Sequence, residues 1–269
     1  MQGTDDKYIK TITTLKHYAA NNCEGERQTG TSVANESTMR EYYLRAFRDI
    51  SENYDPGAVM SSYNGTTIYR NGEILSSSTG QKIDYIASSA KSYLINVTLR
   101  RTYGFGGFVV GDCGAWDNAF GRQPLRKKLY PDTELDSITA PMTIAKIIEA
   151  GSSLDCNSGA NGTGQVAAAV QQGLISEDML DIAVYELFLQ RMKTGEFDEG
   201  AKYQDITSSV IETDEHVQKA EEAAEKSWVL LENDGTLPLK GEKTIADIEY
   251  ENGVGTVNAD AQSGELIIA

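Results

Sequence analysis

Residues 107–115 read Gly-Phe-Val-Val-Gly-Asp-Cys-Gly-Ala. A short β-branched run that ends in Gly-Asp is typical of a buried strand whose last side chain leaves the core. In a parallel α/β barrel the carboxyl end of a strand carries the chemistry, so Asp112 is a candidate nucleophile. Taken alone, the pattern favours a helix cap or an Asx-turn instead, and the choice depends on the rest of the chain.

The chain around this stretch alternates between strand and helix patterns. Strand-like runs occur at 15–20 (LKHYAA) and 58–64 (AVMSSYN), and helical spacing occurs at 38–50 and 138–150. Such alternation predicts an α/β fold with a parallel sheet and active residues on the loops after the strands. About four strands are visible before residue 200, half of what a closed (β/α)8 barrel needs. A half-barrel alone would have two unpaired sheet edges.

The chain after residue 200 is expected to leave this first domain. Residues 212–232 have the pattern of a long amphipathic helix, and Asn-Asp-Gly at 233–235 predicts a turn. We therefore expect a partial (β/α)8 barrel, a helical linker and the truncated or divergent start of a second domain, at 1–200, 201–240 and 241–269.

Composition argues against several classes of function. The 269 residues include 40 Asp and Glu against 24 Lys and Arg, and the net charge of −16 repels nucleic acid and anionic membrane surfaces. Two histidines, and three cysteines without paired short spacing, argue against a zinc site and a Ser-His-Asp triad. Carboxylates are the expected reagents, and we expect no metal and no other cofactor.

The hydropathy pattern predicts no membrane contact. No apolar run reaches the roughly 18 residues of a membrane span. The first six residues, MQGTDD, lack the basic and apolar regions of a signal peptide. Both a cytoplasmic and a secreted location stay open.

Polar side chains at two other predicted strand ends are further candidates. Lys16 and His17 end one strand, and Tyr63 ends the next. Each also has an ordinary interpretation, because a Lys-His pair is usually on the surface and a tyrosine is usually buried with its hydroxyl bonded.

Taken in order, these motifs resemble glycoside hydrolase family 3. The resemblance rests on Lys-His-Tyr-Ala-Ala-Asn at 16–21, Val-Met-Ser-Ser-Tyr-Asn at 59–64 and Gly-Phe-Gly-Gly-Phe-Val-Val-Gly-Asp at 104–112. Gly111 replaces the serine usual in the last motif. The match covers about residues 2 to 240. It implies the C-terminal half of a TIM-type (β/α)8 barrel, with a helical linker toward a missing α/β sandwich domain.

The resemblance implies a retaining, exo-acting glycosidase that releases a sugar from the non-reducing end of plant-derived oligosaccharides. Asp112 would be the nucleophile and would form a glycosyl-enzyme ester that water then hydrolyses. Lys16, His17 and Tyr63 would line the sugar subsite, where they can hydrogen-bond to hydroxyl groups. The expected partner is an oligosaccharide or an aryl glycoside.

Cys113 refines the predicted substrate. Many family members carry tryptophan directly after the nucleophile, whereas Asp-Cys-Gly-Ala resembles the β-xylosidase and α-L-arabinofuranosidase branch. In that branch a second cysteine follows a Leu-Asp, as Cys156 does here. A small residue at Cys113 or a bridge to Cys156 would narrow the pocket in favour of pentoses, while two free, buried cysteines are an equal alternative. A β-glucosidase is the alternative substrate prediction.

The resemblance also implies parts that this sequence does not supply. Retaining chemistry needs a second carboxyl group about 5 to 5.5 Å from the first, and no residue here is an obvious candidate. In the family this acid comes from an Asp-His loop or from the sandwich domain, and the first half of the barrel supplies further sugar-binding residues. The sequence predicts either a glycosidase that needs these segments or a truncated, catalytically silent chain without a general acid.

Overall fold

A computed structural model describes residues 1–74, 86–157 and 163–235, together with short strands after residue 244. The chain forms two compact units, Met1–Ile206 and Thr207–Ala269. The three-part division into 1–200, 201–240 and 241–269 stays a prediction, and most of the last part lies outside the described residues.

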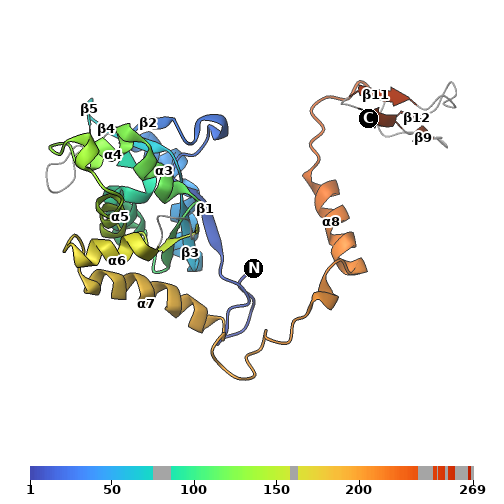
Figure 1. The fold of residues 1–269 in the computed structure, drawn as a ribbon. Helices are drawn as coiled ribbons and strands as arrows, with labels where there is room; N and C mark the ends of the chain where they lie inside the picture. Colours follow the sequence, from blue (N-terminus) through green and yellow to red (C-terminus); the bar gives the residue numbers. More distant parts are fainter. Residues whose placement is uncertain are drawn as a thin grey trace. The chain divides into compact units, whose positions relative to one another are not determined.

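A four-stranded parallel sheet lies at the centre of the first unit (Figure 1). Its strands, in spatial order, are β1 (Thr14–Tyr18), β3 (Ala58–Ser61), β7 (Phe108–Gly111) and β8 (Leu154–Asp155). All residues of β7 are buried, as expected for an apolar strand covered on both faces. The predicted parallel sheet is confirmed, and within the described residues β1 and β8 each pair on one side only.

The register of the sheet aligns the carboxyl ends of its strands. Ser61 of β3 pairs with Gly111 of β7, and Gly111 pairs with Asp155 of β8. Asp112 N–H continues this ladder by donating to Ser61 O at 3.0 Å. The turns after β3, β7 and β8 therefore start side by side.

The loops that leave this edge lead into a second, mixed sheet. It contains β2 (Thr31–Asn35), β4 (Gly65–Arg70), β5 (Glu73–Ile74) and β6 (Ile86–Ala87), with β2 and β4 parallel. The hydropathy pattern does not predict this sheet. Its central strand β4 reads Gly-Thr-Thr-Ile-Tyr-Arg, which has little apolar periodicity although its first four residues are buried.

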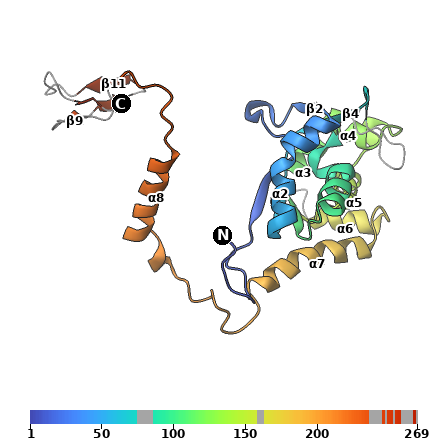
Figure 2. The same cartoon turned by 180° about the vertical axis from the view of Figure 1, so that it is seen from behind.

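Helices pack around the central sheet. The α-helices of the first unit are α1 (Glu36–Thr38), α2 (Arg45–Tyr54), α3 (Ala115–Gly121), α4 (Gln123–Leu129), α5 (Ala140–Glu149), α6 (Thr163–Gln171) and α7 (Glu177–Lys193). Two π-helical segments, η2 (Met39–Tyr43) and η4 (Tyr93–Thr102), and short 3-10 turns, η1 (Glu24–Glu26), η3 (Ser88–Ala90) and η5 (Leu135–Ser137), complete the unit. In both views α5, α6 and α7 lie in succession, and α2 is visible in Figure 2.

Two local features account for the placement of these helices. Pro141 occupies the first turn of α5, where its missing N–H costs nothing, and this matches the helix predicted at 138–150. Phe47 of α2 packs edge-to-face on Tyr18 at 4.9 Å between ring centroids. The Tyr18 hydroxyl donates to Leu94 O at 2.8 Å, so the end of β1 is fixed in the core.

The second unit contains η6 (Ser208–Val210), α8 (Asp214–Ser227), β9 (Ile245–Ala246), β10 (Ile248–Glu251), β11 (Val254–Val257) and β12 (Leu266–Ile267). Thr213 caps α8 by accepting the His216 N–H at 3.4 Å. The helix ends at Ser227, earlier than the predicted 212–232. Among the residues that the structure describes, every helix is too short or too polar to cross a membrane.

Candidate active site

Asp112 stands directly after β7, on the turn that leads into α3. Cys113 N–H donates to its Oδ1 at 2.8 Å, and Ala115 N–H donates to its backbone O at 2.7 Å. Gly114, with a φ of 88°, is the N-cap residue of α3 and supplies the left-handed conformation that the turn requires. Asp112 is therefore not the helix cap that its local sequence favours.

The second carboxylate oxygen of Asp112, Oδ2, faces two basic side chains. His17 Nε2 lies 3.4 Å from it and Arg27 Nη1 lies 3.7 Å from it. Oδ2 is buried and accepts no hydrogen bond from the described part of the chain. One oxygen is thus held by the backbone while the other is unbonded, and a carboxylate in this arrangement can use its unbonded oxygen as a nucleophile.

A bulge at the end of β1 sets the directions of Lys16 and His17. The chain advances three residues between Leu15 and Tyr18 while the paired stretch of β3 advances two. Such a bulge re-aims side chains at the end of a strand. His17 turns toward Asp112, whereas Lys16 is exposed and makes no ion pair or hydrogen bond to the described residues. Lys16 and His17 instead share the wall of an open hollow of about 230 Å³.

The His17 ring is held in a state that suits hydrogen bonding. Burial lowers the pKa of His17 below the ordinary histidine value, against the opposing effect of the Asp112 charge. The charges of Lys16 and Arg27 lower this pKa as well, and Glu24 raises it. The imidazole is therefore neutral at pH 7, with one nitrogen able to donate and the other able to accept.

Tyr63 follows β3 and reaches the backbone beside Asp112. Its hydroxyl donates to Cys113 O, and the Arg27 guanidinium lies over its ring with Cζ 4.7 Å from the centroid. Burial, and then the charge of Asp112, raise the pKa of Tyr63, so the hydroxyl keeps its proton. A Cβ at Gly114 would lie 2.8 Å from this hydroxyl, so the glycine leaves room for the tyrosine.

Cys113 is joined to Cys156 by a disulfide, with Cα atoms 4.7 Å apart. The bridge ties the turn after β7 to the turn after β8. Of the two alternatives left open by the sequence, the structure contains the bridge. The third cysteine, Cys23, is free and exposed.

Trp116 explains why glycine occupies position 111. A Cβ at Gly111 would lie 2.5 Å from Trp116 Nε1 and 2.6 Å from its Cδ1. The indole is buried against the end of β7 as α3 begins. The serine usual at this position would therefore displace the indole.

Arg27 also lies near Asp112, and the sequence pattern does not predict this contact. It follows η1 on the loop after β1, and its Nη1 lies 2.7 Å from Glu24 Oε1 and 3.7 Å from Asp112 Oδ2. A charged loop directly after a candidate strand end was the available signal, but nothing in the sequence distinguishes Arg27 from its charged neighbours. Within the ranges 1–74, 86–157 and 163–235, no cluster of His, Cys, Asp and Glu could hold a metal ion.

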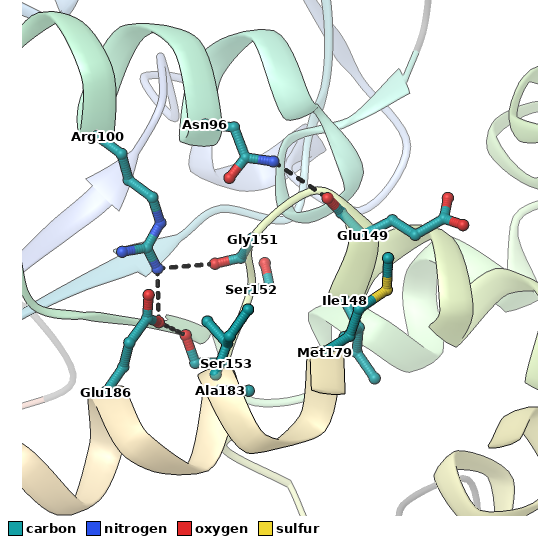
Figure 3. Close-up of a pocket in the computed structure, with 11 residues that line it drawn as sticks. Asn96, Arg100, Ile148, Glu149, Gly151, Ser152, Ser153, Met179, Ala183 and Glu186 are labelled. Atoms are coloured by element: carbon teal, nitrogen blue, oxygen red, sulfur yellow. Dashed lines mark hydrogen bonds and ion pairs between the residues drawn. The ribbon is translucent and has the colours of Figure 1, made fainter. Parts of the chain in front are cut away.

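A larger cavity, of about 270 Å³, lies at the opposite end of the sheet (Figure 3). Arg100 of η4 lines this cavity. It donates to Gly107 O and Gly151 O, both at 3.1 Å, just before β7 and β8 begin. Its Nη2 also pairs with Glu186 Oε2 of α7 at 2.7 Å, and Ser153 Oγ donates to the same oxygen at 2.6 Å. This cavity is therefore lined by an ion pair that also bonds to two backbone carbonyls and a serine hydroxyl.

Known proteins resemble most of this chain, although no protein-family model matches it. Curated relatives include probable exo-1,4-β-xylosidases named bxlB from Aspergillus terreus and Aspergillus oryzae. Both are 32% identical to the chain, over 246 and 248 residues, and the matches cover 88% and 89% of it but only 28% and 27% of the relatives.

Solved structures of glycosidases also resemble this chain. A GH3 exo-β-xylosidase, XlnD, in complex with a xylobiose aziridine activity-based probe matches with a TM-score of 0.70 and 27% identity, over 91% of this chain and 29% of its own. The chain belongs to glycoside hydrolase family 3. The GH3 β-glucosidase of Bifidobacterium adolescentis also matches, with a TM-score of 0.62 and 25% identity over 88% of this chain and 28% of its own.

This family 3 chain has the α/β fold of the N-terminal domain of these enzymes. The named relatives are hydrolases of O-glycosyl bonds. The chain spans less than a third of the length of each relative described above.

Proposed function

We propose that this chain supplies the nucleophile side of a retaining, exo-acting glycosidase site, of the β-xylosidase or α-L-arabinofuranosidase type. The observation that carries this proposal is the pair of contacts around Asp112. Its Oδ1 accepts the Cys113 N–H, while its buried Oδ2 is unbonded and faces His17 and Arg27. A carboxylate with one oxygen held by the backbone is oriented, and its unbonded oxygen keeps its lone pairs for attack.

In the proposed reaction, Asp112 Oδ2 attacks the anomeric carbon of the non-reducing-end sugar. A carbon–oxygen bond forms to the carboxylate as the glycosidic carbon–oxygen bond breaks, and the leaving oxygen takes a proton from an acid. Water then hydrolyses the ester, with the same acid now acting as base. A retaining enzyme needs that acid about 5 to 5.5 Å away, and we infer that it comes from a segment outside this chain.

The other side chains at the carboxyl edge of the sheet would bind the sugar and orient Asp112. His17, and Lys16 from the neighbouring hollow, have donors for sugar hydroxyl groups. Tyr63 acts through the backbone, because its hydroxyl holds the carbonyl of Cys113, the residue next to the nucleophile. These are the roles that the family resemblance implies for the residues that the sheet brings together.

The sheet itself fits the C-terminal half of a TIM-type (β/α)8 barrel. Its four strands are parallel, and β1 and β8 have unpaired outer edges within the described residues. The missing half-barrel would pair with both edges, and a sandwich domain would follow the linker. The chain's coverage of 28% of its relative from A. terreus supports this proposal.

The pentose preference rests on the turn beside Asp112. We infer that the Cys113–Cys156 bridge, which joins the turn beside Asp112 to the turn after β8, narrows the site toward sugars without a hydroxymethyl group. The similar proteins named as xylosidases favour the same substrate class. A β-glucosidase is the second candidate, favoured by the match to the enzyme of B. adolescentis.

A dinitrophenyl β-xyloside tests the proposal without requiring the absent acid. Dinitrophenolate leaves without protonation, so Asp112 alone can form the glycosyl-enzyme and release one equivalent of dye. We expect a burst with the β-xyloside, a slower one with the β-glucoside, and none with Asp112→Ala. No burst from the parent chain would favour the catalytically silent alternative, and a burst that survives in Asp112→Ala would remove Asp112 from the mechanism.

A further inference from the structure

Arg27 connects the loops that follow three neighbouring strands of the sheet. It belongs to the loop after β1, stacks on Tyr63 after β3, and faces Asp112 after β7. Its own loop holds it through Glu24, three residues earlier. Apart from Glu24, Arg27 therefore faces the proposed nucleophile and a tyrosine whose hydroxyl bonds to the nucleophile's turn.

The Arg27 guanidinium lies closer to Glu24 than to Asp112. The same Nη1 atom lies 2.7 Å from Glu24 Oε1 and 3.7 Å from Asp112 Oδ2. The first distance is that of a close, charge-assisted contact, and the second exceeds hydrogen-bond range. Arg27 thus presents its charge to Oδ2 without occupying the lone pairs that an attacking oxygen needs.

We propose that Arg27 is a positioning residue for Asp112, and that Glu24 is the tether that keeps its guanidinium from closing onto the nucleophile. This inference rests on the proposed function. Arg27 acts on Asp112 directly by charge, and indirectly by holding the ring of Tyr63, whose hydroxyl fixes Cys113 O. Loss of the guanidinium leaves Oδ2 misdirected, and loss of the tether lets the guanidinium bond to Oδ2 and mask it.

The two histidines of the chain allow a test that needs no turnover. His17 faces Asp112, Lys16, Glu24 and Arg27, while His216 lies on α8 in the other unit and serves as an internal reference. Because the charge of Arg27 lowers the pKa of His17, Arg27→Met should raise it and Arg27→Lys should restore it. Glu24→Gln should lower it. Histidine titration followed by NMR measures each change.

The burst with dinitrophenyl β-xyloside supplies the second readout. We expect Arg27→Met to slow the burst at saturating substrate by up to about 100-fold, the effect of displacing a reacting group by about 1 Å. Its half-saturating concentration should change little, and Arg27→Lys should recover part of the rate. Glu24→Gln should also slow the burst, although it removes no positive charge. Arg45→Met is the matched control, because Arg45 is exposed on α2 and pairs with Asp49.

The outcomes separate this proposal from the proposed function. Normal bursts in both Arg27→Met and Glu24→Gln, with an unmoved His17 pKa, would overturn the role of Arg27. If the parent chain gives no burst, the proposed function fails and the positioning role of Arg27 fails with it, whatever the His17 pKa does; if the parent chain gives a burst, normal rates in both variants overturn the role of Arg27 alone.

Discussion

The two ends of the central sheet each hold an arginine and a carboxylate, but they differ in how completely these groups are bonded. At the amino end, Arg100 pairs with Glu186 at 2.7 Å and donates to two backbone carbonyls, and Ser153 also bonds to the carboxylate. At the carboxyl end, Arg27 stays 3.7 Å from Asp112, whose Oδ2 accepts no hydrogen bond from the described residues.

This difference is the one expected between a structural ion pair at the amino end and the carboxylate that we propose as the nucleophile at the carboxyl end. A buried charge is costly unless its hydrogen bonds are satisfied, and the amino-end pair meets that condition. The carboxyl-end carboxylate does not, and an unsatisfied group of this kind in a folded protein calls for a functional explanation. Cavity size would mislead here, because the larger cavity surrounds the satisfied pair.

Removal of the disulfide should have the largest effect on stability. The Cys113–Cys156 bridge closes a loop with a sequence separation of 43, for which chain entropy gives a stabilisation of about 4 kcal/mol. We expect Cys156→Ala to lose most of that free energy of unfolding in urea titration. Cys23→Ala is the control, because Cys23 is free and exposed. Equal stability of the two variants would contradict the bridge.

The next largest effect should come from the amino-end ion pair. Arg100→Met strands the Glu186 carboxylate and frees two backbone carbonyls, which should cost about 3 kcal/mol of unfolding free energy. The burst rate per folded molecule should not change. Arg27→Met should show the reverse pattern, a slower burst with a stability loss below about 1 kcal/mol. If both variants affect stability and rate alike, the distinction between the two ends is wrong.

A smaller effect should follow from filling the space above Gly111. Gly111→Ser places a Cβ against the Trp116 indole, and overpacking of this kind costs about 1 to 3 kcal/mol. Trp116 fluorescence should shift because the ring must move. The double variant Gly111→Ser with Trp116→Phe should regain stability relative to the single one, and a failure to regain it would show that the indole is not the obstacle.

The smallest effect is a pH dependence at a third arginine–carboxylate cluster. Glu36 accepts hydrogen bonds from Arg70, Tyr93 and Arg40, and these bonds, the one from Arg70 most of all, lower its pKa to about 2 from the ordinary 4.5. A depressed folded-state pKa gives stability that is complete above pH 4.5 and is lost as the pH falls toward 2. Glu36→Gln should therefore flatten the acid limb of stability between these values, and an unchanged limb would contradict the bonding of this cluster.

The sequence predicts the parts of the fold that depend on local patterns. The apolar run before Asp112 predicts β7, and alternation with helices predicts the parallel sheet, which brings His17 and Tyr63 to the turn after β7. Strand periodicity reports burial, and the carboxyl ends of parallel strands must meet at one edge, so this much follows from pattern alone.

Other features depend on contacts that local patterns do not encode. The Arg27 contacts arise from a loop conformation, and the register shift at the end of β1, where His17 comes within 3.4 Å of Asp112 Oδ2, has no local sequence signal. The buried polar strand β4 has no apolar period to reveal it. The role of Trp116 in excluding serine at Gly111 appears only when the turn is built.

Whether Asp112 is the nucleophile is tested most directly by mapping the covalent product of a xylobiose aziridine, the class of probe bound by the similar xylosidase. Attack by Asp112 would form an ester bond between its carboxylate oxygen and the ring carbon and break the carbon–nitrogen bond, and the released amine nitrogen would take up one proton from solvent. After proteolysis, mass spectrometry should place the label on the peptide with Asp112, and Asp112→Asn should remain unlabelled. A label on any other residue, or equal labelling of Asp112→Asn, would contradict the claim that Asp112 is the nucleophile.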